Sequence, residues 1–162
     1  MKKIRLTVLM LALGLTGAFA QTTPDPTYGY KIKTDTTLGG PAKEFINIAN
    51  RPGTVSVTGL GDDNGTALNP IGFSFHYFYN DYDKVAIGVN GWISFNKSTV
   101  LSPTFPVIPT AGGQNNFIAA YMSDLNFFGP GNPGKMLYWT NNLDSFVVSY
   151  IDVPFWQREA PG

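Results

Sequence analysis

Residues 71–95 constrain the fold more than any other part of this chain, because their apolar residues alternate as they do in β-strands. In the first part of the segment, large apolar side chains occupy every second position, and mostly small or polar residues lie between them. The apolar set is Ile71, Phe73, Phe75, Tyr77 and Tyr79. Successive side chains of a strand point to opposite faces, so the pattern predicts a strand with one face buried in a core.

The loop Val89-Asn90-Gly91 lies between two further apolar segments and has the composition of a hairpin turn. A two-residue turn would place the apolar residues of the two flanking strands on opposite faces. A three-residue loop, with Gly91 left-handed in a β-bulge, instead pairs Gly88 with Trp92. Four apolar residues then share one face: Val85, Ile87, Ile93 and Phe95. Because a one-residue slip would move a whole apolar set into water, the sequence predicts the bulged hairpin, with Trp92 beside Gly88 on the other face.

The rest of the chain indicates an all-β protein. Aromatic residues make up 14% of the sequence, which also holds 18 Gly and 12 Pro and has no amphipathic run of helix length. This composition favours short strands and many turns. Further short strands are predicted at residues 30–33, 45–48, 54–57, 117–121, 135–140 and 146–153, with a long connection at 96–116 and a loop at 129–134. We therefore expect an antiparallel β-sandwich.

The N-terminus has the features of a secretory signal. Lys2, Lys3 and Arg5 precede an apolar run at residues 6–15, and Ala18-Phe19-Ala20 satisfies the small-x-small rule for cleavage. An apolar run of about ten residues is too short to span a bilayer core of roughly 30 Å. Residues 1–20 are thus predicted to be a signal peptide, so the protein is expected to be secreted or on the cell surface, with no membrane span after cleavage.

Charge and cysteine usage exclude several classes of function. Removal of the signal takes three of the 11 basic residues and none of the 11 acidic ones, which leaves a net charge near −3. A nucleic-acid binder would need a basic stripe, and none is visible. Since cysteine is absent, stability must come from the core, a metal or a partner. We expect an extended leader at residues 21–43 and one β-sandwich module at 44–162.

Several motifs resemble those of nidogen-like (NIDO-like) extracellular β modules of bacterial surface and secreted proteins. They are Asp62-Asp63, the Ile-Gly-Phe-Ser-Phe of residues 71–75, and the Asn-Gly-Trp-Ile-Ser-Phe of residues 90–95. The resemblance runs from about residue 45 to 153. Where the family reads approximately Ala-Pro-Phe-Trp-Asp-Asp-Leu, this chain has Met122 and Ser123 at the Trp and first Asp, which weakens a site based on paired carboxylates there. The family's domain continues with further strands, so the resemblance implies a sandwich incomplete at its C-terminus and part of a longer protein.

Catalytic constellations are scarce. The one histidine, His76, lies on the less apolar face of its predicted strand, and no Gly-x-Ser-x-Gly motif accompanies it. A single His without Cys does not provide a zinc site. The sequence therefore predicts a solvent-facing His76 and a protein that is not an enzyme.

Carboxylates are the remaining candidates for chemistry. Asp62, Asp63 and Asn64 offer hard oxygen ligands in a Gly-rich loop, and Asp124 could approach them through the fold, so Asp62, Asp63 and Asp124 are a candidate calcium site. The spacing does not fit an EF-hand. Two alternatives stay open: Asx side chains that hydrogen-bond their own turn, and a glycosidase pair of Asp62 and Asp124.

Aromatic side chains supply a last candidate site. Alternation cannot turn all of them inward, and exposed rings bind sugars or partner proteins. Trp92 and Trp139 are the predicted ligand-binding residues; the other candidates are Phe78, Phe127, Phe128, Tyr138 and Trp156. Alternatively, the second sheet of the sandwich or further strands cover these rings.

Three functions follow from these observations. The first is a non-catalytic module for adhesion or structural spacing, with an extracellular protein or glycan as partner. The second is a carbohydrate-binding module that uses exposed aromatic residues. The third is a hydrolase-associated domain.

Overall fold

The structure, a computed structural model, describes residues 33–96 and 115–156. The chain divides into two compact units, residues 1–44 and 45–162. In the first unit, described residues 33–44 contain no strand and form two turns, in which Thr37 N donates to Thr34 O and Gly40 N donates to Thr37 O. The strand predicted at residues 30–33 and the connection predicted at 96–116 lie mostly outside the described residues.

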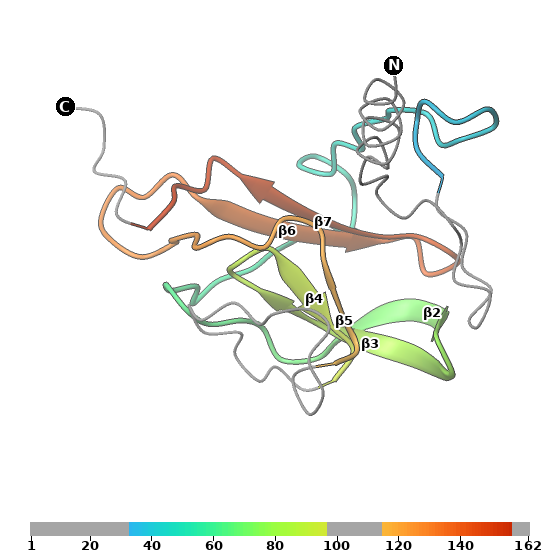
Figure 1. Ribbon diagram of the computed structural model, residues 1–162. Helices are drawn as coiled ribbons and strands as arrows, with labels where there is room; N and C mark the ends of the chain where they lie inside the picture. Colours follow the sequence, from blue (N-terminus) through green and yellow to red (C-terminus); the bar gives the residue numbers. More distant parts are fainter. Residues whose placement is uncertain (1–32, 97–114, 157–162) are drawn as a thin grey trace, which may run out of the picture. The chain divides into compact units, whose positions relative to one another are not determined.

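The second unit consists of two antiparallel sheets (Figure 1). Its strands are β1 (Val55–Ser56), β2 (Asn69–Tyr77), β3 (Asn80–Gly88), β4 (Trp92–Ser94), β5 (Phe117–Ala119), β6 (Lys135–Thr140) and β7 (Phe146–Ile151). One sheet has the order β1-β6-β7 and the other β2-β3-β4-β5. The described residues include no helix, so the all-β prediction is confirmed.

A cluster of apolar side chains joins the two sheets. Ile87 of β3 and Met136 of β6 are completely buried in it, together with Val89. Phe146 and Val148 of β7 pack against the same cluster. Two sheets that share one core face to face form a sandwich, as predicted.

The bulged hairpin between β3 and β4 is confirmed. Gly88 pairs with Trp92 and Ile87 pairs with Ile93, which is the register that the three-residue loop requires. Gly91 has the left-handed backbone of the bulge, with a φ of 80°. A Cβ at Gly91 would overlap the carbonyl oxygen of Tyr121, so the turn also lies directly against the chain that follows β5.

The prediction for Tyr79 is wrong, because β2 ends at Tyr77. Tyr77 pairs with Asn80 across a two-residue turn, and Phe78 takes a left-handed conformation with a φ of 54°. The turn points Tyr79 into solvent, where 71% of it is exposed. Aromatic residues also occur in turns, so the alternating pattern in the sequence extends beyond the end of the strand.

The predicted burial of one whole face of β2 also needs correction. Ile71 is buried with Val85 and Phe95 in a second cluster, against which Phe73 and Phe75 pack only half-buried. The Phe75 and Phe95 rings stack with centroids 5.4 Å apart. β2 is an edge strand of its sheet, so fewer neighbours cover its side chains than cover those of the inner strand β3.

Four other predicted strands differ in extent. The strand predicted at 54–57 is shorter, since β1 contains only Val55 and Ser56. Residues 45–48 form no strand: Ile48 is buried, but Phe45 is 82% exposed. β5 ends at Ala119, two residues earlier than predicted. β7 ends at Ile151 because Asp152 adopts a φ of 50°, which a continuing strand does not allow.

Replacing Ile87 by alanine should lower the free energy of unfolding by about 2–5 kcal/mol, because it leaves a cavity between the two sheets. Ile87 has no exposed surface. Guanidinium unfolding followed by intrinsic fluorescence measures the change. Val55→Ala, on an exposed strand position, serves as the control and should stay within about 0.5 kcal/mol of the wild type. Equal losses for both variants would contradict the position of the core.

Candidate metal centre

Asn64 organises the loop that carries Asp62 and Asp63. Its Oδ1 accepts a hydrogen bond from Gly61 N, and its Nδ2 donates to Gly59 O, both at 2.9 Å. The Asn64 carbonyl also accepts a hydrogen bond from Val89 N at 2.9 Å, which ties this loop to the β3–β4 hairpin. The Asx hydrogen bonds of the turn are thus made by Asn64.

Asn90 connects this loop to the segment after β5. Its side chain is fully buried, and Nδ2 donates to Asp63 Oδ1 at 3.0 Å. Its Oδ1 accepts from Leu125 N at 2.9 Å, and its carbonyl accepts from Ser123 N at 3.3 Å. Asp63 and the backbone on both sides of Asp124 are therefore attached to the same buried residue.

The carboxylates named from the sequence lie together at this point. One oxygen from each of Asp62, Asp63 and Asp124 lies within 4.8 Å of the other two, and all three residues are half-buried. A calcium ion binds oxygen at about 2.3–2.6 Å, so two of its ligands can be at most about 5 Å apart. The spacing of the three oxygens satisfies this condition.

Burial and the neighbouring acids disfavour the charged form of one carboxylate in the cluster, that of Asp62. Asp62 Oδ1 is buried and has no hydrogen-bond partner in the part of the chain that the structure describes. Burial raises the pKa of Asp62 above its ordinary value, and the nearby negative charges of Asp63 and Asp124 raise it further. A cation at this position would supply the missing partner and remove the repulsion. The donor set therefore fits a hard divalent cation.

Trp92 is not an exposed binding platform, which corrects the prediction for this residue. It is only 2% exposed, and its indole lies on the backbone of Gly88, where a Cβ would overlap the ring. The pairing of Gly88 with Trp92 was predicted from the sequence, and the missing side chain of Gly88 provides the space that the ring fills. Trp92 is therefore a packing residue.

Trp139, the other predicted ligand-binding residue, is half-buried and takes part in two contacts. Its Nε1 donates to Pro52 O at 3.0 Å, and the guanidinium of Arg51 lies over the ring, 4.9 Å from its centroid. A sugar would have to displace Arg51 to stack on this face. These contacts give Trp139 a structural role in holding the turn before β1.

His76 faces solvent on β2, as predicted. Its Nδ1 lies 2.8 Å from Asp81 Oδ1, and both side chains are about two-thirds exposed. Among the described aromatic residues, the most exposed are not the predicted Trp92 and Trp139 but Phe45, Tyr79, Phe128 and Tyr121. Sequence reasoning missed Asn90 as a site residue, since an Asn-Gly pair in a hairpin is fully explained by the turn.

These features define a β-sandwich module whose loops bring three carboxylates to one point. A model of the family described as NIDO related matches residues 37–150, so the chain belongs to the nidogen-related family. Domains of this family are extracellular, and the family is one of non-enzymatic modules. No curated protein and no solved structure matches the chain. Within residues 33–96 and 115–156, no helix is long and apolar enough to cross a membrane.

Proposed function

We propose that this chain is a non-catalytic adhesion or spacing module of a secreted or surface-anchored bacterial protein, and that calcium bound by Asp62, Asp63 and Asp124 stabilises it. The observations that carry the proposal are the convergence of these three carboxylates and the presence in Asp62 of a buried oxygen without a hydrogen-bond partner among the described residues. The chain also belongs to an extracellular family. An extracellular protein is the partner that such a module would bind or space.

Calcium would connect segments that are distant in the sequence. Asp62 and Asp63 precede β2, whereas Asp124 follows β5. The segments already share Asn90, through hydrogen bonds to Asp63 Oδ1 and Leu125 N. An ion bound to both would add a link that the unfolded chain lacks, and a ligand that binds only the native state stabilises it.

The arrangement of the acids favours ion binding over hydrolysis. A glycosidase places two carboxyl groups on either side of the scissile bond. Here a third carboxylate shares the position, and Asp63 accepts a hydrogen bond from buried Asn90. The other alternative is glycan binding. Trp92 is buried, so it does not offer a surface for a sugar, and this disfavours that alternative.

Calcium should raise the melting temperature of the protein. At a calcium concentration about 100 times the Kd, the native state gains about 2.7 kcal/mol. For a domain of about this size, that corresponds to a rise in Tm of roughly 10 °C. Thermal unfolding followed by circular dichroism, in chelator and in excess calcium, measures the difference. An unchanged Tm would refute the calcium site.

Asp62→Asn is the matched variant for this experiment. It keeps the shape of the side chain but removes the charge that burial and two neighbouring carboxylates disfavour. In chelator it should therefore be at least as stable as the wild type, while its response to calcium should be lost. Exposed Asp81→Asn should keep the full calcium response. Hydrolysis of a glycan by the wild type that Asp124→Asn abolishes would contradict the non-catalytic assignment.

A further inference from the structure

The outer edge of β7 differs from the other three sheet edges of the sandwich. β1 and β5 have only two and three residues. β2 is interrupted by a register shift between Pro70 and Phe75, and its Ile71 carbonyl accepts a hydrogen bond from Thr140 Oγ1. β7 has six residues, Phe-Val-Val-Ser-Tyr-Ile, with no charge, proline or bulge. Natural proteins protect an edge of this kind or pair it.

The backbone groups on this edge follow from the ladder on the other side. Val57 N donates to Met136 O, so the polar groups of Met136 point to β1 and those of Leu137 point to β7. Leu137 pairs with Ser149, so Ser149 points to β6, whereas Val148 and Tyr150 point away from it. Among the described residues, no hydrogen bond is made to the N–H or C=O of these two.

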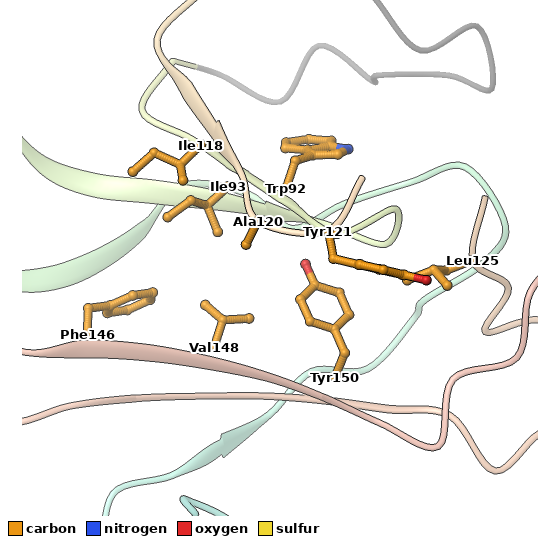
Figure 2. A pocket seen from close by; sticks show the side chains of 10 residues that line it. Trp92, Ile93, Ile118, Ala120, Tyr121, Leu125, Phe146, Val148 and Tyr150 are labelled. Carbon is orange, nitrogen blue, oxygen red and sulfur yellow. The ribbon is translucent and has the colours of Figure 1, made fainter. Parts of the chain in front are cut away.

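An apolar cavity opens beside this edge, between the two sheets (Figure 2). Its volume is about 250 Å³. Ile93 of β4 and Ile118 of β5 line it from one side, together with Ala120 directly after β5. Phe146, Val148 and Tyr150 of β7 line it from the other side. A strand added to β7 would hydrogen-bond with the free edge and place alternate side chains at this cavity.

We propose that a second copy of this chain binds here, with the two β7 strands antiparallel. The strand carries no charge, so pairing with itself places no like charges opposite each other. With the two-fold axis at Ser149, the small serine meets its equivalent, and Val148 of one copy lies opposite Tyr150 of the other. Such a self-complementary contact closes as a symmetric dimer, the commonest oligomer. The inference does not depend on the calcium site.

Removal of one edge donor tests the pairing. Val148→Pro deletes an N–H that points away from β6, and proline is tolerated on an edge strand. Each dimer loses two hydrogen bonds, so its dissociation constant should rise by about tenfold or more. Sedimentation equilibrium of the full chain measures this. Val148→Thr, which has the same shape and keeps the N–H, should dimerise like the wild type.

Disulfide cross-linking between two copies provides a second test of the dimer, which applies even if Val148→Pro fails to fold. The chain has no cysteine, so Ser149→Cys introduces a single thiol that would meet its equivalent on the two-fold axis. Directly opposite residues in such a pair have Cα atoms about 4.5 Å apart, within the range of a disulfide. Ser149→Cys should cross-link under mild oxidation, and Ile151→Cys should not. A monomeric wild type, a dimer indifferent to Val148→Pro, or equal cross-linking of both cysteine variants would overturn the proposal.

Discussion

Gly91→Ala should lower the free energy of unfolding by about 3–5 kcal/mol, one of the largest losses expected from a single methyl group in this chain. Gly91 has a φ of 80°, and strain of this kind costs about 1–3 kcal/mol in other residues. The new methyl group would also overlap the Tyr121 carbonyl oxygen, and forced overlap in a packed region costs roughly 1–3 kcal/mol more. Guanidinium unfolding of the two proteins measures the difference.

Gly53 provides the control for this experiment. Its φ is 84°, but no atom lies within 4 Å of the position that a Cβ would take. Gly53→Ala therefore carries the backbone strain without the overlap, and it should cost only about 1–2 kcal/mol. If both variants lose the same stability, the close contact between the hairpin and the segment after β5 is not present in solution.

Asn90→Asp should cost about 3–5 kcal/mol in the presence of chelator, the loss expected for an uncompensated buried charge. The new carboxylate keeps an oxygen for Leu125 N but loses the donor that Asn90 Nδ2 offers to Asp63. It also adds a buried negative charge beside three existing carboxylates. Calcium should recover part of the loss, so the rise in Tm between chelator and calcium should exceed that of the wild type.

The same Asn-to-Asp substitution at an exposed position distinguishes the effect of burying the new charge from the effect of the substitution itself. Asn47 is exposed, and its Oδ1 accepts a hydrogen bond from Ala49 N in a turn, as an aspartate could. Asn47→Asp should change stability by no more than about 0.5 kcal/mol. An Asn90→Asp variant as stable as Asn47→Asp in chelator would show that Asn90 is not buried among the acids.

The β3–β4 hairpin shows how much of the fold is determined by the local alternation of apolar residues. Side chains of a strand alternate with a period of two, so only one register keeps Ile87 and Ile93 on the same face. That register requires the bulge at Gly91, and the structure has both. The second hairpin, β6–β7, follows from its two apolar runs and polar connection in the same way. In such segments the contacts are between near neighbours, and residue order alone determines them.

Edge positions and strand ends were less predictable. Phe75 and Tyr79 continue the same alternation, yet one is half-buried and the other exposed. The difference arises from the turn at Phe78 and from the position of β2 at the edge of its sheet. Burial depends on what packs over a side chain, and the alternation of a single strand contains no information about that.

The sequence by itself determined the all-β class, the bulged hairpin and the acids that form the candidate metal centre. Only the tertiary structure decided that Asn90 links Asp63 to the backbone beside Asp124 and that Trp92 is buried on Gly88. Asn90 is 27 residues from Asp63 and 35 from Leu125 in the chain, so its two hydrogen bonds exist only after the sheets assemble. Turn chemistry acts between neighbouring residues and is visible in the sequence, whereas contacts across such distances are set by the arrangement of the strands.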